Sequence, residues 1–361
     1  MANATEKAVI LIPSLEPDDR LPAYIANLHE NGFARFVIVD DGSSEKYQPI
    51  FLKIAGMPGC TVLHHEVNRG KGVALKTGYK WIEENCPDIT GVITADADGQ
   101  HTVPDCVKMA EALTTGKRAL YLGSRDFSLP HVPPKSRFGN RITTFFFWVL
   151  YGQWLPDTQT GLRAFRREEL GFMQRIEGDR FEYEMNVLIA CAREKIPMPA
   201  IIIETVYENE NAGTHFHPIR DSIRIYKVLL GQYLRFVGVS IASFLLDNGL
   251  TWLMNDLLLV SVVPEEAIRL SVCNLLARIG SSVFNFTMNK QLIFKLKGGM
   301  GKAAVKYFVL CLVILALSVC GQLALGVVGI DKHISKPICD TILSLLSYRI
   351  QHRWVFKEEN A

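Results

Sequence analysis

The chain has 361 residues, of which 48% are hydrophobic, and its formal net charge is +2 at pH 7. A chain of this length is expected to form about two domains. The small net charge excludes binding of nucleic acid through bulk positive charge. Its eight cysteines are scattered, which favours small buried or lipid-facing side chains over a disulfide framework. Residues 1–7 lack the charged region and cleavage site of a signal peptide, so we expect the chain to lead straight into a strand.

Short apolar runs alternate with helical patterns in the first half of the chain. Four runs are expected to be β-strands: Ala8–Ile12, Phe36–Val39, Thr61–His64 and Gly91–Ala95. Such alternation predicts βαβ units around a mainly parallel sheet, in which ligands bind beyond the carboxyl ends of the strands. Four unusual loops fall at those ends: Pro13–Glu16, Asp40–Ser43, Asn68–Gly72 and Asp96–Gln100.

The loop after the fourth run carries two carboxylates, Asp96 and Asp98, followed by a glycine. In an extended or tightly turned segment this spacing brings both carboxylates to one divalent cation, and Gln100 can supply a third oxygen ligand. Mg²⁺ and Mn²⁺ take oxygen ligands and commonly bridge to the phosphates of a substrate. An isolated Asp-x-Asp would as readily be a solvated turn, but this one accompanies three other unusual loops.

Two of those other loops have a structural and a functional interpretation each. Asp40–Ser43 is either a turn with a helix cap or an acidic site for the ribose or base of a nucleotide, through Asp41. Asn68–Gly72 is either a helix start with exposed cations or a diphosphate site made of backbone N–H groups and Lys71. It is not a P-loop, because Lys71 is followed by glycine and not by Ser or Thr.

Six segments then occur in a characteristic order: Ile12-Pro13 near Glu16, Asp40-Asp41-Gly42-Ser43, Asn68-x-Gly70-x-Gly72, Asp96-x-Asp98-x-Gln100, Gly123-Ser124-Arg125 and Asp157-Thr158-Gln159-Thr160-Gly161. Over about residues 6–230 the chain thereby resembles family-two glycosyltransferases of the dolichyl-phosphate-mannose-synthase type. Arg180–Glu184 also fits a family motif. The chain departs from the family where the usual Tyr-Asn-Glu is Ser14-Leu15-Glu16, which leaves the donor open between a UDP-sugar and a GDP-sugar.

The resemblance implies a GT-A fold, which is a Rossmann-like α/β domain, and it implies roles for single residues. Asp96, Asp98 and Gln100 would hold Mg²⁺ or Mn²⁺ on the diphosphate of a nucleotide-sugar. The remaining donor-binding residues would be Pro13, Glu16, Asp41 and Lys71.

The resemblance also implies phosphate contacts outside the strand-end loops. Arg125 and Arg137 would grip phosphates, and Asp157 would lie in the active site, although by itself it could only cap a turn. Ser136 and Arg137 belong to a basic segment and would meet the acceptor phosphate, together with His215. A zinc site at His215 and His217 is disfavoured, because two histidines beside a proline make a poor ligand set.

From about Leu234 the chain becomes strongly apolar. Four stretches approach the roughly 20 residues that cross a membrane: Val237–Val260, Ala267–Met288, Ala303–Gly329 and Ile334–Ile350. A soluble helical domain is the alternative. Basic residues after the second and fourth stretches place the catalytic domain and both termini in the cytoplasm of a multi-pass cell-membrane protein. We therefore expect a glycosyltransferase domain at residues 1–230 and an α-helical, four-span transmembrane domain at residues 231–361.

The membrane part also contains an internal repeat. Phe284–Phe294 aligns without gaps to Leu346–Phe356, which indicates two duplicated hairpins, and the region resembles GtrA-like domains. Four charged side chains inside these stretches would be costly against lipid, so they either pair or line a head-group path: Asp247, Arg269, Arg278 and Asp340. Ile142–Leu155 and Asp221–Gly231 are expected to be helices at the membrane interface, with a buried helix as the alternative for the first.

Together these features predict metal-dependent, inverting transfer of one sugar to a polyprenyl phosphate, in the biosynthesis of cell-envelope polysaccharides. The acceptor phosphate is itself a nucleophile, since the second pKa of a phosphate monoester is about 6. Translocation of the product by the C-terminal domain is a further option. The alternatives are transfer to another membrane acceptor such as diacylglycerol, or a non-catalytic, nucleotide-regulated lipid-sugar transporter. The sequence leaves the oligomeric state open, a homo-oligomer included.

Overall fold

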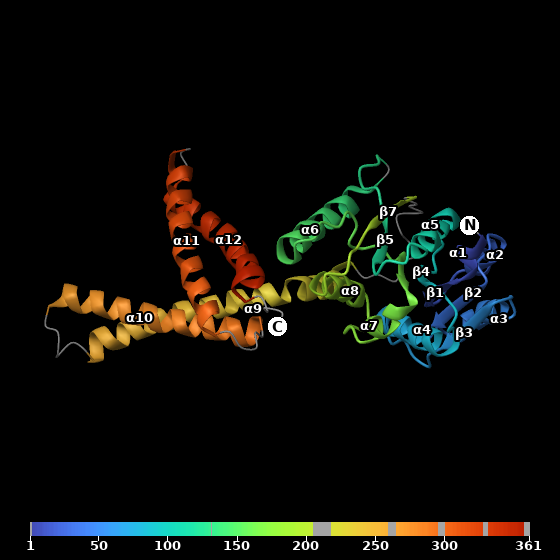
Figure 1. Ribbon diagram of the computed structural model, residues 1–361, viewed down its shortest axis with the longest axis horizontal. Helices are drawn as coiled ribbons and strands as arrows, with labels where there is room; N and C mark the ends of the chain where they lie inside the picture. Colours follow the sequence, from blue (N-terminus) through green and yellow to red (C-terminus); the bar gives the residue numbers. More distant parts are fainter. Residues whose placement is uncertain are drawn as a thin grey trace. The chain divides into compact units, whose positions relative to one another are not determined.

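The computed structural model describes residues 2–130, 132–204, 218–258, 265–294, 300–327 and 331–356. They divide into two compact units, Met1–Leu229 and Leu230–Ala361. The first unit is a mixed α/β domain, and the second is built from helices (Figure 1). The expected class, a Rossmann-like α/β domain followed by a helical region, is therefore confirmed.

A mixed sheet forms the centre of the first unit, and in the described residues its strand order is β3-β2-β1-β4-β6-β5-β7. The strands are β1 (Ala8–Ser14), β2 (Arg35–Asp40), β3 (Cys60–His64), β4 (Gly91–Thr94), β5 (Leu120–Arg125), β6 (Arg163–Arg166) and β7 (Ala200–Ile203). β6 runs antiparallel to β4 and β5, whereas the other pairs are parallel. β1 to β4 lie where apolar runs predict them, and their carboxyl ends share one edge of the sheet.

The helices of this unit connect the strands and cover the sheet. They are α1 (Ala2–Glu6), α2 (Arg20–Glu30), α3 (Gln48–Ala55), α4 (Lys71–Asn85), α5 (Val103–Leu113), α6 (Pro134–Tyr151), α7 (Leu170–Gln174) and α8 (Glu182–Arg193), with short 3₁₀ turns η1 (Glu45–Tyr47) and η2 (Arg167–Glu169). The chain does not lead straight into β1, because Ala4 of α1 packs into the hydrophobic core. α6 begins before Ile142 and ends before Leu155, because Gly152 takes a left-handed conformation and donates its N–H to Trp148.

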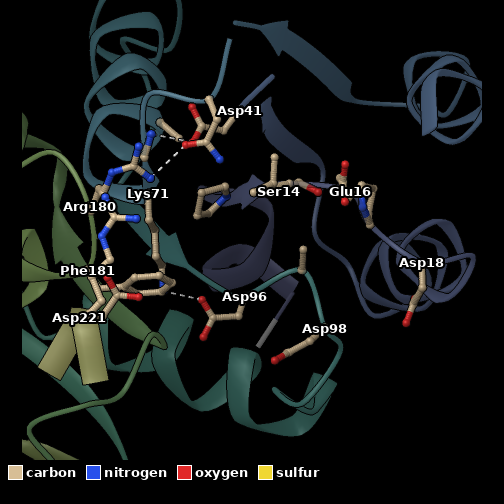
Figure 2. Close-up of a pocket in the computed structure, with 18 of the residues that line it drawn as sticks. Ser14, Glu16, Asp18, Asp41, Lys71, Asp96, Asp98, Arg180, Phe181 and Asp221 are labelled. Carbon is tan, nitrogen blue, oxygen red and sulfur yellow. Dashed lines mark hydrogen bonds and ion pairs between the residues drawn. The ribbon is translucent and has the colours of Figure 1, made fainter. Parts of the chain in front are cut away.

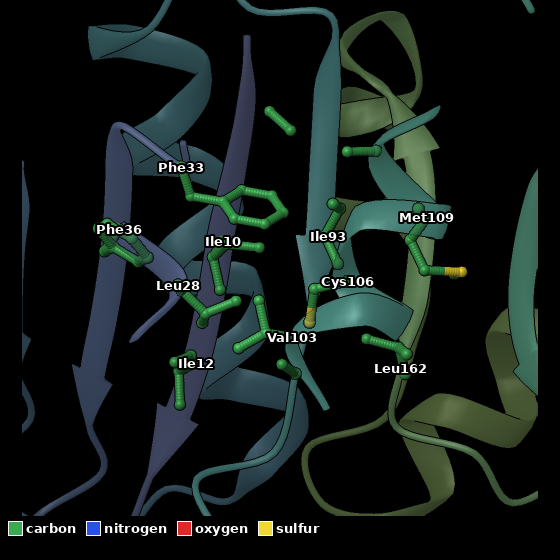
Figure 3. Close-up of a cluster of buried hydrophobic side chains, with 14 of the residues drawn as sticks. Ile10, Ile12, Leu28, Phe33, Phe36, Ile93, Val103, Cys106, Met109 and Leu162 are labelled. Atoms are coloured by element: carbon green, nitrogen blue, oxygen red, sulfur yellow. The ribbon is translucent and has the colours of Figure 1, made fainter. Parts of the chain in front are cut away.

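Alternate residues of β1 serve the two faces of the sheet, as the period of a strand requires. Ile10 and Ile12 belong to a buried cluster with Leu28 of α2 and Cys106 of α5 (Figure 3). Leu11 points the other way and lies against Gly78 of α4, where a Cβ atom would collide with it. The close packing on both faces fixes the strand ends that carry the polar loops.

The second unit contains α10 (Glu266–Met288), α11 (Met300–Val327), α12 (Lys332–Ile350) and most of α9 (Pro218–Leu253), with π-helical turns η4 (Met254–Leu258), η5 (Asn289–Ile293) and η6 (Gln351–Val355). Within the described residues, helices thus occupy all four expected stretches. Among the described helices, two are long and apolar enough to cross a membrane, within Ile219–Leu257 and Gly301–Val327. Leucines of α11 such as Leu312 and Leu323 are largely exposed, which suits a lipid environment.

The internal repeat brings equivalent residues together in the second unit. Asn289 and Gln351 occupy matching positions, and the amide of Asn289 donates to Gln351 at 3.2 Å. The matching rings of Phe294 and Phe356 stack 4.9 Å apart. A π-helical turn begins at each of the two amides. These contacts support a duplicated pair of hairpins.

The charged residues of the apolar stretches have polar partners. Arg278 forms an ion pair with Asp247 at 3.2 Å, and Arg269 donates to Asn255 at 3.1 Å. Asp340 accepts a hydrogen bond from Ser318 at 3.2 Å. The pairing interpretation therefore holds for Asp247 and Arg278.

We predict that Phe165→Ala destabilises the sheet by about 3–5 kcal/mol, because it leaves a cavity in the core. Phe165 is 1% exposed and its ring meets that of Tyr79 edge to face at 5.3 Å. Denaturant unfolding followed by hydrogen exchange of the β4–β6 amides would measure the loss. Leu52→Ala is the control, since Leu52 is 72% exposed and should change stability by less than about 0.5 kcal/mol. Equal effects of the two changes would contradict the assigned core.

Candidate functional site

A pocket of about 600 Å³ lies beyond the carboxyl ends of β1, β2 and β4 (Figure 2). Six of the residues predicted for the donor site line it: Pro13, Glu16, Asp41, Lys71, Asp96 and Asp98. Arg180 and Phe181 line it before α8, and the first turns of α9 complete its wall. Gln100, Arg125, Ser136, Arg137 and Asp157 are outside the lining, and His215 lies outside the described residues.

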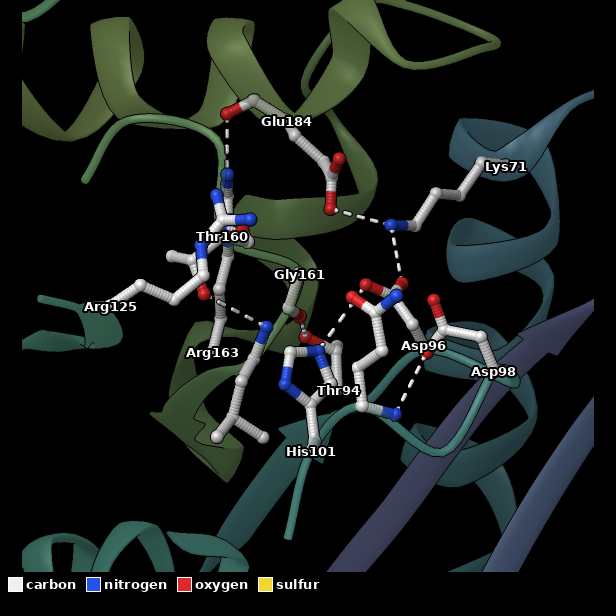
Figure 4. Close-up of polar contacts among 12 residues, drawn as sticks. Lys71, Thr94, Asp96, Asp98, His101, Arg125, Thr160, Gly161, Arg163 and Glu184 are labelled. Carbon is white, nitrogen blue, oxygen red and sulfur yellow. Dashed lines mark hydrogen bonds and ion pairs between the residues drawn. The ribbon is translucent and has the colours of Figure 1, made fainter. Parts of the chain in front are cut away.

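Lys71 and Asp96 form the charged centre of this pocket. The Lys71 ammonium lies 2.6 Å from Asp96 and 3.0 Å from Glu184 of α8 (Figure 4). His101 approaches the other oxygen of Asp96 at 3.3 Å. Burial, the largest single effect, would raise the pKa of Asp96, but the charges and hydrogen bonds of Lys71 and His101 together outweigh it and hold that pKa well below its usual value. Asp96 is therefore a carboxylate at every physiological pH.

The space around Asp96 depends on a glycine. A Cβ atom at Gly161 would collide with the Asp96 carboxylate, so a larger residue there would displace it. The carbonyl of Gly161 also accepts a hydrogen bond from Thr94 at the end of β4. Asp157–Gly161 thereby lies against the Asp-x-Asp loop, although more than sixty residues separate them in the sequence.

Asp98 also lines the pocket but has a different environment. Its carboxylate accepts the N–H of Gln100 at 3.0 Å, which closes a tight turn. Burial and the nearby charge of Asp96 raise the pKa of Asp98. Two carboxylates that repel one another in a cleft gain from a shared cation.

The donor set of this loop fits a hard divalent cation. Asp96, Asp98 and the amide of Gln100 offer only oxygen ligands of the kind that Mg²⁺ and Mn²⁺ prefer. No group of three or more His, Cys, Asp or Glu side chains that could hold a metal occurs among the residues that the structure describes. Substrate phosphates would therefore have to complete the coordination, as is usual for Mg²⁺.

Asp41 holds the loop that leads into α4. Its two oxygens accept the backbone N–H groups of Arg69 and Gly70 at 3.0 and 2.7 Å, and a ring nitrogen of His65 lies at 2.7 Å. Gly70 has a φ of +101°, and a Cβ atom there would collide with Asp179. Asp41 thus positions Lys71 at the start of α4. It remains at the pocket surface, where a ribose could still reach it.

The first motif is shaped by its backbone. Glu16 is exposed, has a φ of +47°, and donates its N–H to Ser43 at 2.8 Å. Ser14 is 2% exposed and lines the pocket, and its hydroxyl has no hydrogen-bond partner among the described residues. Buried hydroxyls are usually paired, so this oxygen is an exception among the described residues.

Arg125 and Asp157 form a buried pair of their own. Two guanidinium nitrogens of Arg125 donate to Asp157 at 2.7 and 3.1 Å, and the Asp157 side chain is fully buried. The N–H of Gln159 also donates to Asp157, at 2.9 Å. With its oxygens occupied in this way, Asp157 is placed to orient Arg125 and its own loop.

α6 carries the remaining predicted residues. Arg137 is exposed and donates to the carbonyl of Leu129 at 2.9 Å, and Ser136 precedes it in the first turn. Asn140 is buried and bonds to Pro156 and Thr158 on either side of Asp157. Further along, Phe145 and Trp148 are partly exposed, as an interfacial helix requires.

Two residues of the charged centre were not predicted for the site. His101 directly follows Gln100, so its place in the Asp-x-Asp loop is the signal that could have found it. Glu184 lies in the motif Arg180–Glu184, but nothing in the sequence connects it to Lys71. Glu184 and Lys71 come into contact because α8 packs beside α4.

Known families match both units. Residues 9–171 match the model of glycosyl transferase family 2, and residues 235–356 match that of the GtrA/DPMS transmembrane domain. With the exposed apolar helices, the second match indicates a membrane protein.

Three relatives match a large part of the chain. An uncharacterised protein of Methanocaldococcus jannaschii is 30% identical over 229 residues, which is 62% of this chain and 92% of that protein. A UDP-N-acetylglucosamine–dolichyl-phosphate N-acetylglucosaminyltransferase of Methanococcus voltae is 26% identical over 55% of this chain and 85% of its own length. A human dolichyl-phosphate β-glucosyltransferase is 24% identical over 64% of this chain and 76% of its own length.

We predict that Asp157→Asn costs about 2–4 kcal/mol of folding stability, because it leaves the Arg125 guanidinium beside a neutral group in a buried site. Denaturant unfolding of the full-length protein would measure it. Glu168→Gln is the matched control, since Glu168 pairs with Arg166 at 3.0 Å but its side chain is 64% exposed. That change should cost less than about 1 kcal/mol. A similar cost for both would show that the buried pair contributes no more than a surface one.

Proposed function

Because the chain belongs to glycosyl transferase family 2, we propose that this enzyme transfers a single sugar from a nucleotide-sugar to a polyprenyl phosphate in the membrane. One observation carries the proposal: the pocket at the strand ends joins Asp96 and Asp98 to Lys71, and the first turns of helix α9, which belong to the same unit, lie in its wall. Relatives whose names specify dolichyl phosphate as the acceptor support it.

The pocket has the size and the chemistry for a nucleotide-sugar. Its volume of about 600 Å³ is typical of sites that enclose small ligands. Pro13, Glu16 and Asp41 line the part beyond β1 and β2, which we assign to the nucleoside. Lys71, Asp96 and Asp98 line the part that we assign to the diphosphate. This order follows the crevice at the strand ends, where nucleotides bind in doubly wound sheets.

We assign Asp96, Asp98 and Gln100 to a Mg²⁺ or Mn²⁺ ion. When bound, the ion would neutralise charge on the donor diphosphate and so help it to leave. Lys71 provides a fixed positive charge beside the same carboxylates, and Glu184 holds its ammonium in place. Asp41 fixes the start of α4 and with it the reach of Lys71. Charges positioned in advance are worth several kcal/mol at a developing negative charge.

The reaction that we propose needs no strongly basic side chain. An oxygen of the lipid phosphate attacks the anomeric carbon, and the bond from that carbon to the diphosphate oxygen breaks on the opposite face. The product is a polyprenyl-phosphate-sugar of inverted configuration, and the nucleoside diphosphate departs. Because the carboxylate of Asp157 is taken up by Arg125 and Gln159, we give it a positioning role, and we place Arg125 near the reacting phosphates.

We further propose that the catalytic unit and both termini lie in the cytoplasm. The lysines beside α11 and the arginines at the end of α12 support this orientation. Arg137 and Ser136 lie on α6, whose exposed Phe145 and Trp148 would dip into the interface. Arg137 and Ser136 would then meet the acceptor phosphate at the membrane surface.

The proposed function is tested by incubating the purified full-length protein with a panel of UDP- and GDP-sugars and undecaprenyl phosphate. We expect one donor to give a lipid-linked monosaccharide in the presence of Mg²⁺ or Mn²⁺. Diacylglycerol in place of the lipid phosphate should give no product. Product with diacylglycerol alone, or donor binding without any turnover, would reject the proposal.

We predict that Asp98→Asn lowers transfer by at least about a hundredfold, because it removes a charged ligand of the metal. The variant should remain folded. The raised pKa of Asp98 means that the folded protein binds more protons than the unfolded chain between the unfolded and the folded pKa, so its stability falls as the pH rises through the folded pKa. An asparagine side chain at this position carries no charge, so the variant avoids this loss of stability. Unfolding at pH 7 in EDTA should therefore show the variant at least as stable as the wild type, and a clearly less stable variant would contradict the assignment.

A further inference from the structure

Arg163, the first residue of β6, is a buried cation without an ion pair of its own. It is 5% exposed, and no carboxylate lies within ion-pair distance of it in the part of the chain that the structure describes. Its Nη2 is buried and has no hydrogen-bond partner among those residues. Arg125, by contrast, is paired with Asp157 at 2.7 Å. Burying a charge without a counter-charge is costly, so the remaining contacts of Arg163 must repay that cost.

The alternation of side chains along β6 places this arginine inside the unit. Ala164 belongs to the hydrophobic core on one face of the sheet, so Arg163 and Phe165 project to the opposite face. α4 covers that face, since the ring of Phe165 meets that of Tyr79 edge to face at 5.3 Å. Only a cavity of about 10 Å³ remains beside Arg163, and Tyr79 and Tyr183 line it. The packing therefore leaves the guanidinium little freedom to turn.

The guanidinium connects two backbone segments that are more than twenty residues apart in the sequence. Its Nε donates to the carbonyl of Thr160 at 3.0 Å, and its Nη1 donates to the carbonyl of Glu184 at 2.8 Å (Figure 4). Thr160 directly precedes Gly161, where the Asp96 carboxylate leaves no room for a Cβ atom. One end of this connection therefore lies in the segment that shapes the space around Asp96.

The other end, Glu184, contacts the Lys71 ammonium at 3.0 Å. Lys71 faces the carboxylates of both Asp96 and Glu184, so these three groups together carry one negative charge. The guanidinium of Arg163 supplies the positive charge that balances them. Burial raises the pKa of Tyr79; the charge of Arg163 opposes this rise and that of Glu184 reinforces it. Arg163 and Glu184 thus act on the same phenol, as close neighbours do.

We propose that Arg163 is a positioning residue for the diphosphate side of the donor pocket. It holds Glu184 in place, and through Glu184 it sets the position of the Lys71 ammonium. It also fixes the segment beside Asp96, and its charge balances the carboxylates from behind. This inference rests on the proposed function and deepens it, since it names the buried support of the groups that we assign to the diphosphate and the metal.

An arginine suits this role better than a lysine. Its planar guanidinium has donors that point in different directions, so one side chain reaches the carbonyls of Thr160 and Glu184 at once. It also keeps its charge at every relevant pH. A lysine would keep the charge but could not span both carbonyls with the same geometry. The two properties can therefore be separated by substitution.

The test measures binding of UDP and of GDP to the full-length protein at saturating Mn²⁺. We expect Arg163→Met to weaken binding of the better nucleotide by about ten- to a hundredfold, which is usual when the support of a metal ligand is lost. Arg163→Lys retains the buried charge and should remain folded. It should recover only part of the loss, because one of the two hydrogen bonds is missing. Unchanged binding in both variants would overturn the proposal.

Arg167→Met is the matched control. Arg167 also donates to two backbone carbonyls, those of Cys86 and Glu83 at 3.0 and 3.1 Å, but it does not line the pocket. The control thus removes the same number and kind of hydrogen bonds. Nucleotide binding should change by less than about twofold in Arg167→Met, which is under 0.5 kcal/mol at about 1.4 kcal/mol per tenfold. Equal weakening by Arg167→Met and Arg163→Met would show a merely structural role and would overturn the proposal.

A double variant tests the charge balance without metal or nucleotide. Arg163→Met combined with Glu184→Gln removes one positive and one negative charge together. In urea unfolding with EDTA, the double variant should be at least as stable as Arg163→Met alone. Two independent losses would add instead, so a double variant clearly less stable than either single variant would overturn the proposal. Wild-type protein that binds neither UDP nor GDP would instead reject the proposed function itself.

Discussion

The ion pair between Lys71 and Asp96 is the contact on which the pocket depends. It joins the start of α4 to the end of β4, and Glu184 extends it to α8. Because the three groups come from different elements, each must be held by its own surroundings. Asp41 anchors the loop before α4, and Gly161 leaves room for the Asp96 carboxylate. Buried charges are tolerated only when they are paired and hydrogen-bonded, so this network restricts how the strand ends can be arranged.

Two other carboxylates of the first unit, Asp157 and Asp98, lie in different environments. Asp157 is fully buried, and its carboxylate accepts hydrogen bonds from Arg125 and from the N–H of Gln159. It therefore stabilises its loop. Asp98 is half-buried, is repelled by Asp96, and has a raised pKa. Perturbed carboxyl pKa values cluster at functional sites, and a bound cation would relieve the repulsion between the two carboxylates. The contrast agrees with the roles that we propose, in which Asp157 supports the fold and Asp98 binds the metal.

The sequence predicts most of the fold because its signals are local. Apolar runs locate β1 to β4 to within a few residues, and four apolar stretches coincide with helices of the second unit. The antiparallel β6 was not predicted, since Arg163–Arg166 is a strand with three buried residues and two arginines, and its direction follows from the return of the chain. Glu184 reaches Lys71, and Arg220 reaches the pocket, only through packing over long sequence distances. The end of α6 was missed because a left-handed glycine, and not the aromatic pattern, terminates it.

In the second unit, too, buried polar side chains hydrogen-bond to one another. Here the surroundings are expected to be lipid. Asn289 is fully buried, and it contacts Asn285 and Gln351, which lie one helical turn away and in the matching repeat. A buried amide loses more in lipid than in water if its partner is displaced. A shift of one hairpin by a single residue would separate Asn289 from Gln351 and Phe294 from Phe356 together. The duplicated sequence therefore specifies its own register: each repeat supplies the polar partner that the other requires.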